Sequence, residues 1–335
     1  MKILYLFRKS NTFSIEKVFQ LINDELKLKY QTNSLKVYSK YEKPQYVLIN
    51  ILYIFVKRAI INRYDIIHVT GVIHYLVLFL PKNKTILTIH DCIKYYQHSG
   101  FSQIIIKYLW FKLPVSYLKY ITVISKKTKD DLVKITNCNP NKILVIENPV
   151  SITSQTYFKD FDQKKPRILQ IGTSPNKNLT RLIEALEGIN CTLVIIGHIN
   201  SNILELLAKL KTNYLNYTNL SDNEIVEEYR KCDIVSFVST FEGFGVPIIE
   251  GQINARVVLT SNISPHKEVG SDGAYFVDPY SIQSIRDGVK VLIENNDLRN
   301  DLINKGLINA QKYNPKIIAS RYENLYQFVQ SNNKS

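Results

Sequence analysis

The sequence is poor in cysteine and has no long hydrophobic run. Its four cysteines lie far apart in 335 residues and show no metal-ligand spacing, so metal binding through them is not expected. We expect free thiols in a reducing cytoplasm. No stretch reaches about 18 uninterrupted apolar residues, so no membrane-spanning helix is expected. The opening residues, MKILYLFRKSN, are too short an apolar run for a signal peptide and predict a β-strand.

Motifs for two common ligand classes are also missing. No GxGxxG follows the opening strand or any other predicted strand, which argues against an NAD-dependent dehydrogenase. There is no RNP-like, zinc-finger or helix-turn-helix signature, so no nucleic-acid partner is expected.

Acidic residues are scarce in one half of the chain only. The net charge is +14, and residues 1–150 hold 23 Lys and Arg against 9 Asp and Glu, whereas residues 151–335 hold 20 of each. The basic half is also rich in tyrosine. Basic and aromatic residues together indicate a surface that meets anionic lipid headgroups or an acidic partner. The alternative is a lysine-rich surface that is simply solvated.

Apolar segments typical of strands alternate with helical segments in both halves, and the strands lack strict polar alternation. This pattern predicts an α/β protein whose parallel sheets are covered on both faces. The chain is long enough for two domains. We therefore expect two Rossmann-like domains facing each other across a cleft, at residues 1–155 and 156–312, with a polar linker at 151–166.

One stretch in the second half combines a strand, a glycine turn and a helix start. Residues 231–238 predict a short buried strand, and the glycine-rich segment at 242–245 cannot continue it. Pro247 suits the first turn of a helix, where its missing N–H costs nothing. The backbone N–H groups of Gly243, Phe244 and Gly245 would then point with the positive end of a helix dipole at one site. This arrangement predicts an anion-binding site.

Two carboxylates, Glu242 and Glu250, flank this predicted anion site. A carboxylate beside a bound phosphate is unfavourable unless it contacts another part of the ligand. Sugar hydroxyls donate hydrogen bonds and are the natural candidates. The pair therefore suggests a ligand with both phosphate and hydroxyl groups. In the alternative interpretation, Glu242 caps the helix and Glu250 is an ordinary acid of its first turn.

The sequence EGFGVPIIEG, from Glu242 to Gly251, resembles the paired-glutamate motif of retaining GT-B glycosyltransferases, in particular glycosyltransferase family 4 (glycosyl transferases group 1). The resemblance implies that Glu250 binds the ribose of the donor and that Glu242 lies beside the transferred sugar. It also implies that the amides of the turn meet the diphosphate or the sugar. The chain departs from the family pattern at Val238, usually proline, and at 255–258, where relatives commonly carry glycine and proline.

The loop at 172–179 resembles the family's opening of the second domain. There, a basic pair neutralises the departing diphosphate, while Gly172 and Thr173 would line the donor. Lys177 matches the lysine of that pair, whereas Thr173 stands where many relatives have arginine. Arg181, one turn into the following helix, is either a substitute for that arginine or merely exposed.

Three other segments carry family features. Thr218 lies in the loop at 217–221, which in the family wraps the nucleobase with backbone hydrogen bonds. The last predicted helix lies at 313–330. In GT-B proteins the last helix commonly crosses back onto the first domain. The loop at 8–14, glycine-rich in many relatives, contains no glycine here, which puts its role in doubt.

In the first half, the strand at 84–89 ends in His90 and Asp91. This pair resembles the family's first-domain histidine, whose side chain or neighbouring backbone approaches the transferred sugar. Asp91 is expected to orient His90 or to cap the next segment. His68 and His74, near the end of an earlier strand, are expected to be structural or to contact the acceptor.

Two further segments of the basic half are rich in large apolar residues. Residues 45–63 are apolar with basic residues at one end, and predict either a buried helix or a helix with one face on a bilayer. Residues 93–120 interleave aromatic residues with Lys107, Lys112 and Lys119. Such spacing suits a membrane interface, and equally a core helix with lysines at its margin.

Together these features predict a retaining, metal-independent glycosyltransferase with no cofactor, which takes sugar from a UDP- or GDP-linked donor. Lys177 and the turn amides would stabilise the leaving diphosphate in place of a metal. Glu242 and His90 would flank the sugar. The basic half suggests a glycan or lipid-linked acceptor at the cytoplasmic membrane face, as in bacterial surface polysaccharide or lipopolysaccharide assembly. The alternatives are a weakly active nucleotide-sugar or nucleic-acid binding protein, or another GT-B enzyme such as a sugar-nucleotide epimerase.

Overall fold

The computed structural model describes residues 1–8, 14–37, 44–151 and 156–333. The chain divides into two compact units. Unit 1 comprises Met1–Ser151 and Asn314–Ser335, and unit 2 comprises Ile152–Tyr313. Most of the loop at 8–14 and part of the predicted linker lie outside the described residues.

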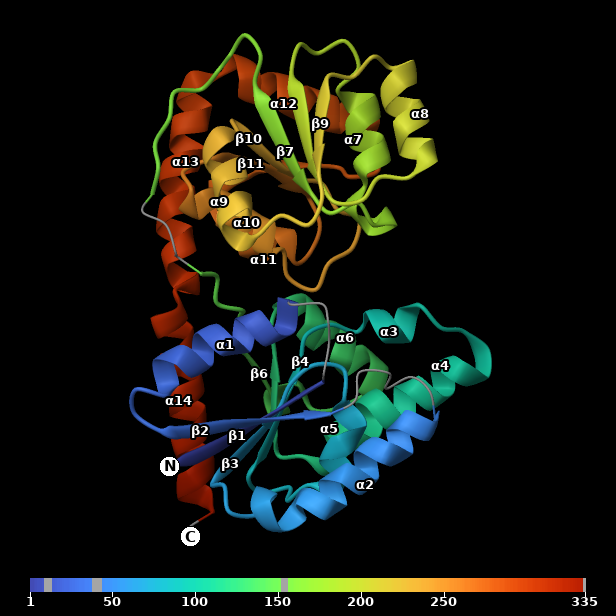
Figure 1. Ribbon diagram of the computed structural model, residues 1–335, viewed down its shortest axis with the longest axis vertical. Helices are drawn as coiled ribbons and strands as arrows, with labels where there is room; N and C mark the ends of the chain where they lie inside the picture. Colours follow the sequence, from blue (N-terminus) through green and yellow to red (C-terminus); the bar gives the residue numbers. More distant parts are fainter. Residues whose placement is uncertain (9–13, 38–43, 152–155, 334–335) are drawn as a thin grey trace. The chain divides into compact units, whose positions relative to one another are not determined.

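Unit 1 contains a six-stranded parallel sheet in the order β2-β1-β3-β4-β5-β6 (Figure 1). The strands are β1 (Lys2–Arg8), β2 (Gln31–Val37), β3 (Ile66–Val69), β4 (Thr85–Ile89), β5 (Tyr120–Val123) and β6 (Ile143–Val145). Successive side chains of β1 enter two different buried clusters, with Tyr5 in one and Leu4 and Leu6 in the other. The sheet is therefore buried on both faces, which confirms the prediction made from the strand pattern.

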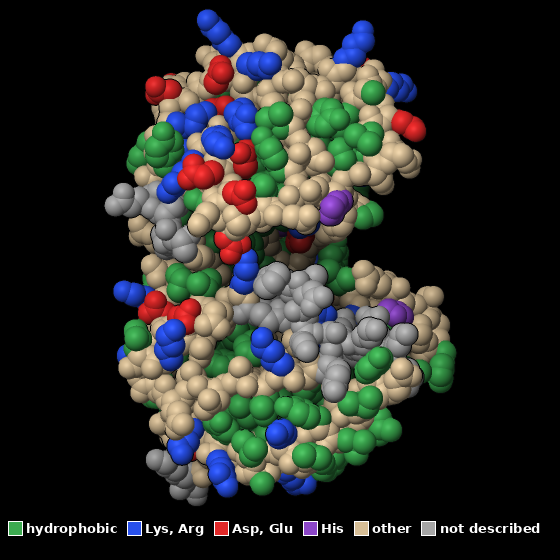
Figure 2. Space-filling model, in the orientation of Figure 1, with side chains coloured by type: hydrophobic (Ala, Val, Ile, Leu, Met, Phe, Trp, Pro, Cys, Tyr) green, Lys and Arg blue, Asp and Glu red, His purple; other side chains and the backbone are tan. Residues whose placement is uncertain are grey.

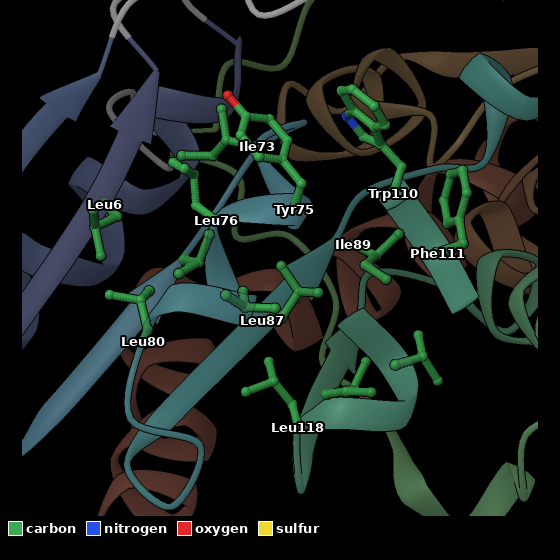
Figure 3. Packing of buried hydrophobic residues seen from close by; sticks show 14 of the residues in the cluster. Leu6, Ile73, Tyr75, Leu76, Leu80, Leu87, Ile89, Trp110, Phe111 and Leu118 are labelled. Carbon is green, nitrogen blue, oxygen red and sulfur yellow. The ribbon is translucent and has the colours of Figure 1, made fainter. Parts of the chain in front are cut away.

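Helices cover both faces of this sheet. They are α1 (Ser14–Leu26), α2 (Pro44–Ile61), η1 (His74–Phe79), α3 (Ile93–Tyr96), α4 (Gly100–Ile106), η2 (Lys107–Lys112), α5 (Leu113–Tyr117), α6 (Lys126–Thr136), η3 (Pro140–Lys142) and α14 (Pro315–Asn332). On one face, Tyr75 and Leu76 of η1 and Trp110 and Phe111 of η2 pack near Leu87 of β4 (Figure 3). Within the described part of the chain, no helix is long and apolar enough to cross a membrane.

The C-terminal helix α14 packs against the other face of the unit 1 sheet through a buried polar network. The Tyr326 hydroxyl lies 2.6 Å from His68 Nδ1, and His68 Nε2 lies 2.7 Å from Thr88 Oγ1. Burial lowers the pKa of His68 to about 3, so this imidazole is neutral. At the helix margin, Arg321 forms an ion pair with Glu147 and donates to the carbonyl of Val145 (2.7 Å). His68 is therefore a structural residue that ties the end of the chain to β3.

Unit 2 contains a second six-stranded parallel sheet, in the order β12-β11-β10-β7-β8-β9. Its strands are β7 (Arg167–Ile171), β8 (Thr192–Ile196), β9 (Tyr214–Tyr217), β10 (Ile234–Phe237), β11 (Val257–Ser261) and β12 (Tyr275–Val277). Its helices are η4 (Pro175–Lys177), α7 (Leu179–Ala185), α8 (Ser201–Lys209), α9 (Asp222–Lys231), α10 (Val246–Ile253), α11 (His266–Gly270), η5 (Ser271–Gly273), α12 (Ile282–Glu294), α13 (Asn296–Ala310) and η6 (Gln311–Tyr313). Because the strands are parallel, the loops after β10, β7, β8 and β9 emerge along one edge of the sheet.

One family departure in unit 2 has a visible backbone consequence. Ala255, in the segment where relatives commonly carry glycine, adopts a left-handed φ of 55° between α10 and β11. A β-carbon makes that conformation unfavourable. The next residue, Arg256, donates to the carbonyl of Tyr157 (2.5 Å), which fixes the turn to the chain that enters the unit. The departure therefore affects packing at the base of the sheet.

Candidate functional site

The glycine turn between β10 and α10 forms as predicted. The strand ends at Phe237, and α10 begins at Val246 with Pro247 in its first turn. Gly245 has a φ of 120°, and a β-carbon there would lie 3.0 Å from Ile248 Cδ1. The turn thus requires glycine both for its backbone conformation and for space. The amides that precede α10 lie at the amino end of this helix, where its dipole favours an anion.

Glu242 meets the lysine from the neighbouring loop. Its Oε1 lies 2.7 Å from Lys177 Nζ and accepts a hydrogen bond from Asn176 Nδ2 (3.1 Å). Asn176 also donates to the carbonyl of Phe241 (3.1 Å), which joins the two loops beside the carboxylate. Both charged side chains are partly exposed, at 21% for Lys177 and 15% for Glu242. Glu242 does not cap α10, since the cap residue Gly245 lacks a side chain and α10 has no side-chain cap.

The position of Lys177 depends on the absence of a side chain at Gly172. Gly172 has a φ of 86°, and a β-carbon there would lie 3.1 Å from both Cγ and Cε of the lysine. The lysine stem therefore crosses directly over the glycine. Its ammonium group ends 4.7 Å from the centre of the Phe237 ring, at the end of β10. Gly172 thus allows a cation from the β7 loop to reach the glycine turn after β10.

Glu250 is held by a residue that the sequence did not single out. The Tyr229 hydroxyl, from α9, donates to Glu250 Oε2 at 2.6 Å. Burial, followed by the nearby carboxylate, raises the pKa of Tyr229 well above its usual value, so the phenol stays protonated and remains a donor. Glu250 lies beyond the first turn of α10, where no acidic residue is found. Its geometry is thus that of an oriented acceptor rather than a helix-end charge.

The other predicted residues of unit 2 lie along the same sheet edge. Thr173 donates to the carbonyl of His198 (2.5 Å) and packs against Gly197, after β8. Thr218 is exposed directly after β9. Arg181 donates to Asn178 Oδ1 (2.8 Å) and stacks on a tyrosine ring. Thr173 therefore connects two loops and brings no positive charge to the place where many relatives have arginine.

Beneath the glycine turn lies His266, also missed by the sequence analysis. Its ring packs 5.0 Å from Phe237, and Nδ1 lies 3.1 Å from Thr260 Oγ1. Burial, and then the charge of Lys177, lower the pKa of His266 to about 3. A neutral ring here supports the turn without adding charge. Neither Tyr229 nor His266 lies in a recognisable local motif, and only the fold brings them to the site.

His90 belongs to unit 1, at the end of β4. Its side chain is buried, packs edge-on against Phe19 with 5.8 Å between the rings, and its Nε2 has no hydrogen-bond partner among the described residues. Burial lowers its pKa to about 3. Asp91 Oδ1 accepts from the amide of Ile93 (2.9 Å), the first residue of α3, although the N-cap position of that helix is Cys92. His74 lies 2.8 Å from the carbonyl of Trp110 and is an interior residue.

Metal ligands do not gather in the described part of the chain. Within residues 1–8, 14–37, 44–151 and 156–333, no three His, Cys, Asp or Glu side chains are close enough to hold one ion. The charged groups of the site in unit 2 are instead the ammonium of Lys177 and the carboxylates of Glu242 and Glu250.

Comparison with known proteins gives two adjoining family matches. Residues 24–154 match the family described as Glycosyltransferase Family 4, and residues 154–307 match Glycosyl transferases group 1. The chain is 29% identical over 224 residues to O-antigen chain mannosyltransferase RfbU of Salmonella typhimurium, a match that covers 63% of this chain and 61% of that protein. It is 27% identical over 252 residues to an N-acetylgalactosaminyltransferase of Campylobacter jejuni that acts on a diphospho-undecaprenol-linked substrate, with 71% and 68% covered.

Solved structures show the same fold. A glycosyltransferase from Rickettsia africae has a TM-score of 0.79 and 20% identity, with 98% of each chain covered. HepE of Anabaena, in complex with UDP and glucose, has a TM-score of 0.79 and 15% identity, with 98% and 99% covered. The two family matches agree with the two parallel sheets. The chain is a glycosyltransferase of the GT-B fold and belongs to the families described as Glycosyltransferase Family 4 and Glycosyl transferases group 1.

Proposed function

We propose that the enzyme transfers a sugar, with retention of its anomeric configuration, from a nucleotide-diphosphate sugar to a glycan or lipid-linked acceptor. The observation that carries this proposal is the meeting of Lys177 and Glu242 beside the glycine turn. A cation and backbone N–H groups suit a diphosphate, and a carboxylate suits the hydroxyls of the attached sugar. Unit 2 would bind the donor, and unit 1 would bind the acceptor.

The charges fit the breaking of a sugar–phosphate bond. As that bond breaks, its electron pair moves to the diphosphate oxygen and positive charge grows on the sugar. The ammonium of Lys177 and the amides of Gly243, Phe244 and Gly245 would stabilise the departing diphosphate. Glu242 would accept hydrogen bonds from the sugar and stabilise its positive charge. His90, neutral because of its burial, would act near the transferred sugar without adding charge.

The ion pair between Lys177 and Glu242 would be exchanged for contacts with the donor when the donor binds. A diphosphate competes with Glu242 for the ammonium group, and a sugar hydroxyl replaces the ammonium as the partner of the carboxylate. Glu250 would bind the ribose hydroxyls, with its carboxylate oriented by the hydroxyl of Tyr229. The ribose contact would fix the nucleotide end of the donor and leave the sugar end at Glu242.

The acceptor class is inferred from the relatives. One related protein is named for O-antigen chains, and another for a substrate linked to diphospho-undecaprenol. By analogy with these names, the acceptor of this enzyme would be a glycan or a lipid-linked glycan in bacterial surface polysaccharide or lipopolysaccharide assembly. An enzyme with such an acceptor would work at the inner face of the cell membrane.

The test is release of nucleoside diphosphate from a panel of UDP-, GDP- and other nucleotide sugars, with EDTA present. We expect release from one donor that chelator does not diminish and that Glu242→Ala abolishes. Proton NMR of the glycoside formed would then show whether the anomeric configuration is retained. Neither binding nor turnover of any donor, with extracts of surface glycolipid supplied as acceptor, would contradict the proposal.

A further inference from the structure

Helix α2 carries large apolar side chains on the side that faces away from unit 1. The exposed ones are Leu48, Ile49, Leu52, Phe55, Val56 and Ile60. Their spacing places them in one stripe of the helix. Asn50, Ile54 and Ile61 lie on the opposite side and are buried in the unit. The buried alternative predicted for this segment therefore holds for the inner face only, and the outer face of the same helix is also apolar.

The continuous helical segment formed by α4, η2 and α5 repeats this arrangement. Its exposed apolar side chains include Phe101, Ile104, Ile105, Tyr108, Leu109 and Leu113, whereas Trp110 and Phe111 are buried. These two sets make up 12 of the 26 exposed large hydrophobic side chains in the described part of the chain. Single exposed apolar residues need no explanation, but their concentration on two helical segments indicates an interaction surface.

The two outer stripes belong to neighbouring elements. Asn50 of α2 donates to the Tyr75 hydroxyl of η1 (3.0 Å), and the Tyr75 ring lies 5.2 Å from that of Trp110 in η2. Phe55 of α2 also packs on Phe79 at the end of η1, with 5.7 Å between the rings. Figure 2 shows hydrophobic side chains gathered over α2 and others at α4. We call the two stripes together the outer apolar face.

The charges on the two helical segments themselves have one sign. Neither helical segment contains an acidic residue, whereas α2 carries Lys57 and Arg58 and the second segment carries Lys107 and Lys112. Lys57 lies 5.9 Å from the ring of Tyr53, and Lys112 lies 5.1 Å from the ring of Tyr108. These lysines cover aromatic surface with their stems and carry their charge to its margin, as lysines do at a lipid interface.

We propose that the outer apolar face docks on an anionic lipid bilayer, with both helical segments lying in the plane of the interface. Helix α2 has 18 residues and would extend over about 27 Å of the membrane surface. Its aliphatic side chains would enter the boundary between headgroups and acyl chains, while the lysines and arginines contact anionic headgroups. A second copy of this chain is a poorer partner, because a symmetric contact would bring cations against cations.

This surface stands on observations separate from those of the donor site. It bears on the proposed function through the acceptor, since an enzyme held on a bilayer reaches a lipid-linked substrate in two dimensions. The donor site lies in unit 2, whereas the outer apolar face lies in unit 1. Failure of one proposal therefore leaves the other testable.

The test is flotation of the full chain with phosphatidylcholine vesicles, with and without phosphatidylglycerol, at low and high salt. We expect retention on the anionic vesicles at low salt and weaker retention at high salt. Leu52→Gln combined with Val56→Gln should reduce vesicle affinity at least tenfold, because it removes two inserted aliphatic groups. Lys57→Gln combined with Arg58→Gln should reduce it about fivefold for each cation removed.

Matched controls come from unit 2. Ile308 is 67% exposed, and Ile308→Gln removes an exposed aliphatic side chain away from the outer apolar face. Lys209 and Lys290 are also exposed, and the double variant Lys209→Gln with Lys290→Gln removes two cations there. These controls should keep wild-type vesicle binding. Thermal unfolding of each variant checks that the substitutions, all at partly or fully exposed positions, leave the fold intact.

Three outcomes would overturn the membrane assignment. The first is no retention of the wild type on anionic vesicles at low salt. The second is an equal loss of binding in the unit 2 controls. The third is self-association, seen by sedimentation velocity, that Leu52→Gln with Val56→Gln abolishes while vesicle binding is unchanged. Binding of nucleotide sugar, measured on the same samples, reports on the donor site independently.

Discussion

The contact between Gly172 and Lys177 makes a sharp prediction, because it separates backbone strain from loss of a catalytic group. In Gly172→Ala, the new methyl group would lie 3.1 Å from Cγ and Cε of the lysine, at a φ of 86°. The left-handed backbone alone should cost about 1–2 kcal/mol of unfolding free energy. The lysine stem must also shift by a few tenths of an ångström, which disturbs the 2.7 Å contact between its ammonium group and Glu242.

A matched control for the backbone cost is available in the same unit. Gly188 has a φ of 70°, and a β-carbon there would meet only the end of Arg286 at 3.9 Å. Gly188→Ala should therefore lower the free energy of unfolding by about as much as the backbone strain does in Gly172→Ala. For a unit of this size, each variant should show a thermal midpoint lower by about 2–8 °C.

The two variants should differ in catalysis. If Lys177 stabilises the departing diphosphate, its displacement in Gly172→Ala should lower kcat by about 10- to 100-fold. The upper value is the fall in kcat that is typical when one transition-state contact is removed. Gly188→Ala should keep kcat near the wild-type value. The assay is nucleoside diphosphate release at saturating donor, at a temperature well below both midpoints. Equal turnover in the two variants would refute the role that we assign to Lys177.

Three other predictions address the remaining site and packing residues. Glu250→Ala should weaken donor binding, measured by calorimetry, about tenfold or more. His90→Ala should leave donor affinity unchanged and lower turnover. Equal donor affinity in Glu250→Ala and wild type would count against the ribose role. His68 has a folded pKa of about 3, below its unfolded value, so its contribution to stability is present above pH 6.5 and is lost as pH falls toward 3. Acidification from pH 7 to 5 should therefore destabilise the wild type by about 2 kcal/mol more than His68→Gln in chemical unfolding. Ala255→Gly should raise the free energy of unfolding by about 1 kcal/mol, since it relieves a φ of 55°, and a fall would contradict this account.

Much of the sheet architecture was predictable because buried parallel strands have a strong sequence signal. The opening residues form β1 (Lys2–Arg8), and the strand predicted at 84–89 is β4 (Thr85–Ile89). Two edge strands were not predicted. β2 reads QTNSLKV and β9 reads YLNY, with mostly exposed or half-buried side chains. An edge strand has one neighbour and little core to fill, so its sequence carries no continuous apolar run.

The candidate site was predictable only where local sequence sets local geometry. The glycine turn is such a case, because Gly245 requires its φ of 120° and Pro247 suits a helix start whatever surrounds them. Contacts between distant residues were out of reach. Tyr229 reaches Glu250 from α9, and Asn176 reaches Glu242 from a loop 66 residues earlier. The family motif assigned Lys177 and Glu242 to one donor site, but neither the motif nor any spacing in this chain predicted their ion pair.

The outer apolar face shows why a helical pattern alone could not decide between core and surface. Periodicity reveals a polar stripe when a helix has one, but α2 is apolar on both sides, so its sequence does not say which side the sheet covers. The packing settles this: Ile54 and Ile61 fill the core, and what remains outside is a second apolar stripe that no described residue covers. Water is a poor solvent for that stripe, and the basic residues beside it have no acidic neighbours on either helical segment. A surface of apolar and cationic groups is matched by an interface that offers both hydrocarbon and negative charge, and an anionic bilayer is the environment that supplies the two together.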